Sequence, residues 1–389
     1  MAGAADVTDA ESCRGEEEAV DANTQPQKDW VNIVFLSLTP IIGVFGTLAY
    51  ALAFGVRWWE PVLFLVTYLL VGLSVTAGYH RLYAHRGYKS HPVVEAFFLF
   101  FGAMALQNSV LHWASDHRTH HRYVDRDWDP YSIRRGGLWA HILWLFYKRP
   151  PHETFENVPD LKKNRLVMLQ YRFSNALGIV AGLGLPTLVG WAFGHPLGGL
   201  LWGGFLRIAV IHHTTFFVNS IAHMYGSRPF SEESSARDNW MLAFVTNGEG
   251  YHNFHHRFPS DFRNGFRWYQ WDPTKWLIRA LAAMGLAKDL RSTPRAVVEK
   301  ARLEIAVRHA EGRMARLTAD ARDLVRSRLN EAAAFLDRAA AHHKEAQARL
   351  SRSMRGWRRN LRLERACVFR ARRYRRGALR ILSGATEGA

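Results

Sequence analysis

The feature that most constrains the fold is a long apolar run, Val31–Gly55, that contains no charged side chain. As a helix, this run is long enough to cross the hydrocarbon core of a membrane, which is roughly 30 Å thick. Three further apolar runs follow at Pro61–Tyr79, Asn175–Phe193 and Leu197–Ala222. Because soluble core helices are usually shorter, the pattern predicts an all-α integral membrane protein with four transmembrane helices.

A fifth apolar run, Val93–Val110, differs from these four because it contains Glu95, Gln107 and Asn108. Polar side chains of this kind are costly in a hydrocarbon core. We therefore expect an embedded or interfacial helix that returns to the side of the membrane from which it came.

Lys and Arg residues are distributed unequally among the connections between the apolar runs. The connection 56–60 has one Arg and one Glu, and the connection 194–196 has neither Lys nor Arg. The segments between the second and third runs and after the fourth run are rich in both residue types. The positive-inside rule places those segments in the cytoplasm, so the four helices form two hairpins with both chain ends inside.

Composition divides the chain into three parts. Residues 1–29 are acidic and lack an apolar run, which predicts a disordered N-terminal segment. Residues 30–290 hold nearly all the aromatic side chains and form the predicted membrane domain with a cytosolic helical cap. Residues 291–389 are rich in Ala and Arg and carry about half of the 51 Lys and Arg residues. Much of the net charge of +17 therefore lies in this C-terminal part. Cys13 and Cys367 lie in opposite terminal parts, which predicts neither a disulfide framework nor a cysteine metal site.

The basic C-terminal part has a helical pattern. Apolar side chains recur in steps of four and three from Leu303 to Leu324, which predicts an amphipathic helix or a short coiled coil. Beyond Met354 the sequence RGWRRNLRLERACVFRARRYRRGALR is strongly basic. Anionic lipid of the cytoplasmic leaflet is the first partner we expect for this segment, and docking of an acidic protein is a further option. A nucleic-acid partner would be unusual for a membrane protein.

Nine of the 19 histidines fall in four short stretches, HRLYAH, HRTHH, NSIAH and HNFHH. The predicted topology places all four stretches on the cytoplasmic side, and the apolar runs alone define that topology. Imidazole is a good ligand for iron, zinc and copper. The sequence therefore predicts a metal centre at the cytoplasmic membrane edge, formed by His80, His85, His117, His120, His121, His223, His252, His255 and His256.

Spacing predicts which of these side chains converge. HRTHH places its histidines at i, i+3 and i+4, on one helix face, so we expect its three imidazoles in one small volume, and HNFHH repeats the spacing. Asn219 and His223, four residues apart, also share a face. His80 and His85 are five apart, and we expect them to serve one site only if the second transmembrane helix ends near His80 and the chain then bends.

Nine imidazoles are too many for one tetrahedral zinc ion and suit two metal ions of higher coordination number, with iron favoured for oxygen activation. The chain has no His-Glu-x-x-His motif of a zinc protease, and it has one Glu-x-x-His match, at Glu249 and His252, where soluble carboxylate-bridged di-iron bundles need two. We expect Glu249 to orient His252 through a hydrogen bond, and His141 to support the ligands similarly. His212 and His213, inside the fourth run, are expected to form hydrogen bonds between helices.

The same stretches resemble a known family. HRLYAH, DHRTHHRYVDRDWDP with RRGGLWAH downstream, NSIAHMYG and GEGYHNFHHRFPSD are similar to the motifs of membrane acyl-CoA desaturases of the stearoyl-CoA, delta-9 type. The resemblance covers about residues 30–285 and includes the spacing between motifs. It implies four transmembrane helices, a cytosolic cap, two iron ions, and dioxygen-dependent insertion of a cis double bond into a long-chain acyl-CoA. It assigns the nine histidines as iron ligands and Asn219 as a residue that holds iron through a water molecule.

We then expect the electrons to come from a separate protein, because the given sequence has no His-Pro-Gly-Gly haem-binding stretch. The resemblance implies a donor of the ferredoxin or cytochrome b5 type with its reductase.

Substrate contacts are expected beside the histidines. Trp113, Tyr79, Phe98 and Phe101 are candidates for the wall of an acyl tunnel, although core packing also accounts for each of them. Arg118, Arg134, Arg135, Lys148 and Arg149 could contact the polyanionic CoA head, although positive-inside charge at the membrane rim also accounts for each of them. The resemblance selects three of these five cations. The three predicted CoA contacts are Arg118, Lys148 and Arg149.

Two other functions use the same residues. A membrane fatty-acid or alkane hydroxylase would share the iron and dioxygen chemistry but leave a hydroxyl group, and an acyl-lipid desaturase would take its acyl chain from a lipid. A transporter or metal-storage protein is the alternative from another class. The near absence of charged residues at the middle of the predicted spans argues against it.

Overall fold

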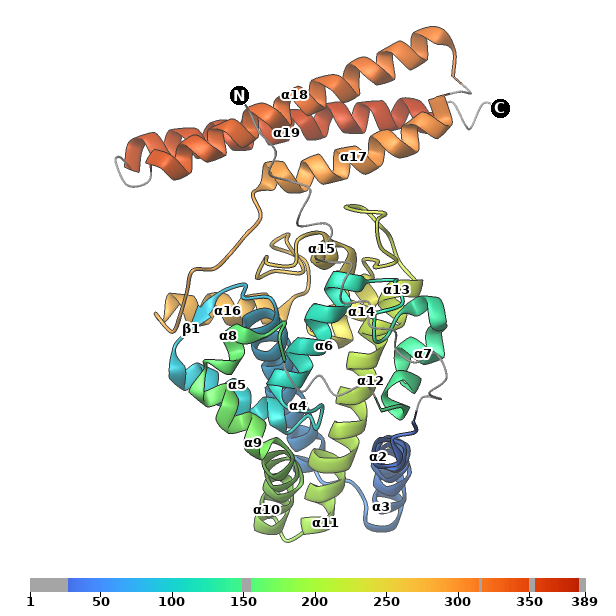
Figure 1. Ribbon diagram of the computed structural model, residues 1–389, viewed down its shortest axis with the longest axis vertical. Helices are drawn as coiled ribbons and strands as arrows, with labels where there is room; N and C mark the ends of the chain where they lie inside the picture. The colour runs from blue at the N-terminus through green and yellow to red at the C-terminus, as the bar shows by residue number, and fades with distance from the viewer. Residues whose placement is uncertain (1–26, 149–154, 315–316, 350–353, 385–389) are drawn as a thin grey trace, which may run out of the picture.

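The computed structural model describes residues 27–148, 155–314, 317–349 and 354–384. Within those ranges the chain is mostly helical, and the one sheet pairs two short antiparallel strands, β1 (Lys89–Ser90) and β2 (Ala287–Lys288). Figure 1 shows three levels: a bundle of upright helices, a cap of short helices above it, and a layer of long helices beyond the cap. The predicted disordered segment 1–29 lies outside the described residues except for its last three.

Three helices are long and apolar enough to cross a membrane, at Trp30–Phe54, Trp59–Ala84 and Arg165–Ala192. Each contains a π-helical section, where the backbone winds more widely than in an α-helix. The first comprises α2 (Trp30–Pro40), η1 (Ile41–Gly46) and α3 (Thr47–Phe54); the second, α4 (Trp59–Leu73) and η2 (Ser74–Ala84); the third, α9 (Arg165–Ile179), η5 (Val180–Gly184) and α10 (Leu185–Ala192). They correspond to three of the four predicted spans.

The fourth predicted span is also helical, as α11 (Pro196–Gly199), η6 (Leu200–Leu206) and α12 (Arg207–Asn219). Its interior is more polar, and Arg207 is fully buried. The guanidinium donates to the Gly203 and Gly182 carbonyls at 3.1 and 2.7 Å and to the Met104 carbonyl. Arg207 thus satisfies backbone carbonyls of three different segments where regular helical bonding is interrupted.

The two histidines inside this helix do form the predicted hydrogen bonds. His212 donates from Nε2 to the Ala105 carbonyl at 2.7 Å, and His213 lies with Nδ1 3.0 Å from Nε2 of His141. Both contacts join α12 to other parts of the fold, and neither involves the nine histidines of the predicted metal centre.

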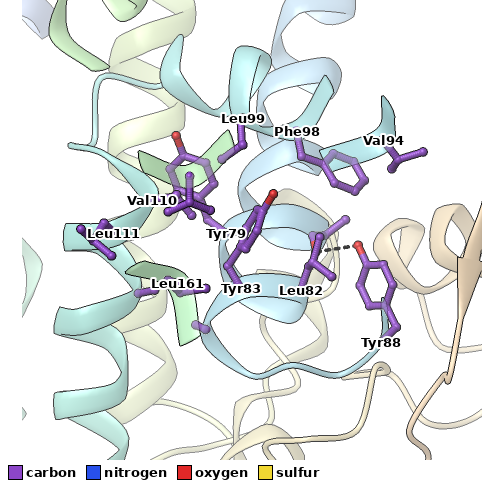
Figure 2. Close-up of a cluster of buried hydrophobic side chains, with 14 of the residues drawn as sticks. Tyr79, Leu82, Tyr83, Tyr88, Val94, Phe98, Leu99, Val110, Leu111 and Leu161 are labelled. Carbon is purple, nitrogen blue, oxygen red and sulfur yellow. Dashed lines mark hydrogen bonds between the residues drawn. The ribbon is translucent and has the colours of Figure 1, made fainter. Parts of the chain in front are cut away.

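The fifth apolar run forms the shorter helix α5 (Pro92–Ala103), whose first turn is capped by His91. Figure 2 shows the buried cluster that packs α5 against η2 and α6 (Val110–Tyr123), which includes the aromatic rings of Tyr79 and Phe98. Both side chains are fully buried and belong to this cluster, which is consistent with core packing, one of the two roles considered for them. Phe101 packs instead against a second buried cluster that contains Val71 and Met104.

Short helices and turns form the cap across the upper ends of the bundle (Figure 1). They are η3 (Ile133–Arg135), α7 (Gly137–His141), η4 (Leu143–Phe146), α8 (Pro159–Lys162), α13 (Ile221–Met224), α14 (Trp240–Val245), α15 (His252–Arg257) and α16 (Pro273–Ala283). Together with α6 and the top of η2, the cap carries every histidine of the predicted metal centre.

The C-terminal part forms α17 (Arg295–Met314), α18 (Ala319–Arg349) and α19 (Met354–Gly384), which share a buried apolar cluster. Helicity was predicted correctly, but the expected continuous helix or coiled coil through Leu324 is wrong, because α17 ends at Met314. The break shifts the register: Leu324 is 46% exposed and Val325 is buried in its place. These helices lie at the end of the molecule opposite α3, α10 and α11 (Figure 1).

Candidate metal centre

The nine histidines form two groups, each able to hold one metal ion. Within a group, the nitrogen atoms that face the centre lie within 4.8 Å of one another. The five-histidine group contains His80, His85, His117, His121 and His255, and the four-histidine group contains His120, His223, His252 and His256. The structure therefore brings together all nine predicted histidines, in two sets.

The prediction that each histidine triplet serves one small volume is wrong. On α6, His117 and His121 face the five-histidine group and His120 faces the other. On α15 the division is reversed, with His255 alone in the five-histidine group. Adjacent helical residues are about 100° apart, so the second and third histidines of each triplet point to different sides, while i and i+4 stay aligned.

His80 and His85 reach the same group without the predicted helix end. The helix continues through His80 to Ala84 as the π-helix η2, and the His85 amide donates to the His80 carbonyl at 3.0 Å. In a π-helix this i to i+5 bond places residue i+5 one turn above residue i. The wider winding therefore aligns two histidines that an α-helix would point in different directions.

The imidazoles face one another through their Nε2 atoms. In the five-histidine group, Nε2 of His85 lies 2.7 Å from that of His117, and Nε2 of His255 lies 2.9 Å from that of His121. In the other group, the Nε2 atoms of His223 and His252 are 3.1 Å apart. Convergence of so many lone-pair nitrogens on two points is the arrangement that a nitrogen-bound metal ion requires.

Burial favours the neutral form of most of these rings, which is the form that binds a metal. Burial, with the nearby imidazoles, lowers the pKa of His121 to about 3. Burial also lowers the pKa of His223 to about 4, against the opposing effect of Asp125. Burial is also the main cause that lowers the pKa values of His117, His252 and most of the other rings.

Several rings are supported from behind at Nδ1, which leaves Nε2 free to bind. Nδ1 of His120 lies 2.8 Å from a carboxylate oxygen of Asp129, and Nδ1 of His117 lies 3.3 Å from the Tyr131 hydroxyl. The Ser235 hydroxyl lies 2.6 Å from Nδ1 of His223. These contacts set the tautomer and ring orientation of ligands from both groups.

Sequence reasoning missed these supporting residues. Asp129 and Tyr131 belong to the DRDWDP stretch and its continuation, directly after HRTHH, and a carboxylate so close to a histidine cluster is a usable signal. Ser235 is held in turn by Asp125, which accepts from both its amide and its hydroxyl at 2.6 Å. Nothing in the sequence distinguishes Ser235 from its serine neighbours.

Glu249 supports a different histidine from the predicted one. Its carboxylate lies 2.8 Å from Nδ1 of His80, whereas we expected it to orient His252. Arg81 and Asn264 also donate to it, at 2.9 and 2.6 Å. Burial by itself would raise the pKa of Glu249, but His80 and Arg81 lower it to about 2, so the carboxylate is ionised.

His141 and Asn219 lie beside the centre with different contacts. His141 contacts the Ser220 hydroxyl at 3.1 Å through Nδ1 and His213 through Nε2, where direct support of a ligand was expected. Asn219 is the last residue of α12 and lines a cavity whose wall also includes His117.

Two cavities meet at Trp113, whose ring stacks on His117 at 5.0 Å between centroids. The first extends from His80 and His252 toward Gly72. Its wall also includes the apolar side chains Val75, Ile211 and Val218. The second is lined by Asn32, Phe35, Leu106, Tyr131, Trp144 and Asn219. Trp113, a candidate for the tunnel wall, thus borders both cavities.

The three predicted CoA contacts have different surroundings. Arg118 uses all five of its N–H donors within the protein, on both Asp160 oxygens and the carbonyls of Tyr83, Ala84 and Asn157, in place of the expected phosphate contact. Lys148 is exposed. Arg149 lies outside the described residues.

Comparison with known proteins covers most of the chain. Residues 57–289 match the family model for fatty acid desaturases. The chain is 39% identical over 285 residues to acyl-CoA desaturase 1 of Saccharomyces cerevisiae, covering 72% of this chain and 55% of that protein. It is 37% identical over 279 residues to stearoyl-CoA desaturase 4 of Mus musculus, covering 69% of this chain and 77% of that protein.

A third relative carries a different substrate in its name. The sn-2 palmitoyl-lipid 9-desaturase of a Nostoc species is 36% identical over 282 residues, which cover 71% of this chain and 95% of that protein. The chain spans little more than half the length of the yeast relative.

Proposed function

The chain belongs to the fatty acid desaturase family, and on that premise we propose that it is a membrane acyl-CoA desaturase. It would insert a cis double bond, at the delta-9 position that the resemblance implies, into a saturated acyl chain. The observation that carries the proposal is the convergence of two histidine groups beside a cavity that Trp113 and apolar side chains line. The names of the yeast and mouse relatives support the acyl-CoA assignment.

Each histidine group would hold one iron ion. The neutral, buried imidazoles fit a dication because their Nε2 atoms converge while carboxylates and hydroxyls occupy Nδ1. The four-histidine group has one ligand fewer, and Asn219 would complete it through a water molecule. Two iron ions bound here would supply, from dioxygen, the oxidising power needed to remove hydrogen from unactivated methylene groups.

The chain's own residues would hold the substrate and protect it. The apolar wall of the first cavity, with Val75, Ile211 and Val218, would keep the acyl chain extended and exclude water. Trp113, stacked on His117, would restrict which pair of adjacent methylenes faces the histidine groups. The reaction removes one hydrogen from each of two neighbouring carbons and reduces dioxygen to two waters, with two further electrons and two protons from outside.

Four helices would cross the membrane, with Pro196–Asn219 as the fourth, and both chain ends and the metal centre would be cytoplasmic. Two observations support this orientation. The connections that contain few basic residues, near Gly55 and Gly194, lie at the end of the bundle away from the cap (Figure 1). The segments that carry the histidines are rich in Lys and Arg.

The partners would be a long-chain acyl-CoA and a separate electron donor of the ferredoxin or cytochrome b5 type with its reductase. Lys148 is exposed and is the described cation best placed for the CoA head, because Arg118 is engaged within the protein. Anionic lipid would contact the basic C-terminal helices.

An acyl-lipid desaturase is the second candidate, and the Nostoc relative's name is the observation that favours it. The two are distinguished by supplying purified protein with a stearoyl thioester of CoA or with a distearoyl phospholipid in the same bilayer. The first proposal requires product from the thioester.

The function is tested by fatty-acid analysis of cells that express the wild-type chain, a His120→Ala variant or a His195→Ala control. His195 precedes α11 at the far end of the bundle, so its removal should leave the product unchanged. We expect a new monounsaturated acyl chain in the wild type and the control, and none with His120→Ala. A hydroxy acid would identify a hydroxylase, and an unchanged acyl composition despite bound iron would refute the proposal.

A further inference from the structure

The metal-binding helix α15 is only six residues long and places three histidines in the two groups. A helix this short has little stability of its own, so its position must come from tertiary contacts. Two buried residues between its ligands make those contacts. Asn253 accepts from the amides of Phe230 and Ser231 and donates to the carbonyls of Ser231 and Ala236.

Phe254 anchors the other side of α15 in an aromatic pocket. Its ring stacks on Phe266 at 5.1 Å between centroids and meets Phe230 edge-on at 5.3 Å. The pocket is completed by Val298 and Ala301, both buried, which lie on α17 in the basic C-terminal part. Figure 1 shows α17 directly above α15. A side chain that lies between metal ligands is therefore packed by residues beyond the matched family segment, which ends at 289.

Ion pairs around this pocket join the same elements. On α17, Arg308 and His309 contact the Glu232 carboxylate at 3.3 and 2.8 Å. Arg257, at the end of α15, lies 3.7 Å from Glu304 of α17. These pairs are partly exposed, so each contributes little energy, but they orient α17 over α15 and over the segment that Asn253 binds.

The other face of α17 is held by the long basic helix. Glu299, next to Val298, is buried and lies 2.8 Å from Arg372 and 3.7 Å from Arg375 of α19. Apolar side chains of α17, α18 and α19 form one cluster beside this ion pair. The C-terminal helices thus form one packed unit that presents Val298 and Ala301 to the metal-binding helix.

From these contacts we infer that α17 holds α15 in its metal-binding position, with Val298 and Ala301 as positioning residues, so that the C-terminal helices form part of the metal centre. The inference rests on the proposed metal centre but not on the reaction. Because coupling between two equilibria is reciprocal, packing of α17 raises metal affinity and bound metal stabilises the packing of α17.

The first test compares two adjacent substitutions in the full-length protein, Val298→Asp and Val297→Asp. Val298 is 1% exposed and faces Phe254, whereas Val297 is 41% exposed, so the pair matches in chemistry and position along the chain. Protein loaded with ferrous iron without oxygen is titrated with a chelator, and the iron retained is measured. We expect Val298→Asp to release iron at about 10-fold lower chelator concentration, as loss of support for a ligand does, and Val297→Asp to match the wild type.

The second test uses the wild-type protein alone, so it does not depend on whether a variant folds. Amide hydrogen exchange is compared with and without iron. We expect iron removal to accelerate exchange in 295–314 and 230–236, with α9 and α10 as unaffected internal references. The inference would be overturned if the two variants released iron at the same chelator concentration. It would also be overturned if the rate of amide exchange in α17 were the same with and without iron. Failure of the wild type to bind iron would instead reject the proposed metal centre.

Discussion

In the metal centre, nine histidines lie close together and nearly all the rings are kept neutral, whereas in the C-terminal helices a buried carboxylate lies among arginines. The first region has an excess of lone pairs and needs a cation from outside. The second has its charges matched within the chain: Glu299 faces Arg302, Arg372 and Arg375, and its pKa is lowered by them although burial alone would raise it. The comparison teaches that buried polar residues of similar density can indicate either a ligand site or a structural ion network, and that the balance of charge distinguishes them.

The largest effect should follow from removing one ligand of the five-histidine group. His255→Ala takes away an imidazole whose Nε2 lies near those of both His80 and His121. We expect loss of the iron in that group and desaturation below detection. Iron content measured by atomic absorption, with product analysis by gas chromatography, checks this. Retention of full iron content would show that the nine nitrogens do not act as ligands, and the contrast between the two regions would then fail.

A smaller effect is expected from a supporting residue. Asp129→Asn keeps the size of the side chain next to Nδ1 of His120 but removes the charge. Loss of such a partner typically lowers metal affinity by about 10- to 100-fold. Chelator competition should therefore give a midpoint between those of the wild type and of His255→Ala. Asp127→Asn is the matched control, because Asp127 is exposed in the same stretch.

In the C-terminal helices, Glu299→Gln leaves three arginines facing a neutral amide. Substitution at such a buried group should cost roughly 1–3 kcal/mol of local stability. This loss should be measurable as faster proteolysis or faster amide hydrogen exchange in α19.

The stabilisation by Glu299 should also depend on pH, with a defined sign. Because the folded-state pKa is below the ordinary value of 4.5, the stabilisation is complete above pH 4.5 and is lost as the pH falls through the folded value. Glu299→Gln should remove this acid dependence, and its persistence in the variant would assign it to another group.

The smallest effect on the fold is expected on the outer surface of α19. Arg365, Arg373 and Arg376 are exposed, so charge reversal at all three should change stability by no more than about 0.5 kcal/mol per site and leave bound iron unchanged. If anionic lipid is the partner of this surface, binding to vesicles that contain phosphatidylserine should fall in the triple variant. Unchanged vesicle binding would remove lipid as the partner and leave an acidic donor protein to be tested.

The sequence predicted well which histidines cluster. It predicted poorly how they are grouped and which residues support them. All nine histidines were predicted, because membrane-length runs and motif spacing are local properties of the chain. Their division into two groups was not, and neither was the choice of His80 as the partner of Glu249. Those features depend on how α6, η2 and α15 face one another, which spacing within a single helix does not specify.

The prediction of substrate contacts was also limited, because the charge of a side chain does not show which distant residue it binds. Arg118 has the charge that a phosphate contact requires, yet Asp160, 42 residues along the chain, binds it with two hydrogen bonds. Val298 and Phe254, 44 residues apart, meet in one pocket although the basic composition of the C-terminal part suggested only a surface segment. Long-range partners of this kind have no signature in the residues that flank them.

By itself, the sequence determined the helical membrane character, the set of histidines that cluster and the family, since apolar length, imidazole chemistry and motif spacing act within short stretches of chain. The tertiary structure decided which imidazoles form each group, which polar groups hold them and why α17 contacts α15. The physical reason is that the direction in which a side chain points depends on backbone winding and on helix packing, which short stretches of sequence do not specify. A π-helical turn in η2 aligns His80 with His85, and the packing of α15 between the cap and α17 aims its three histidines at two different points.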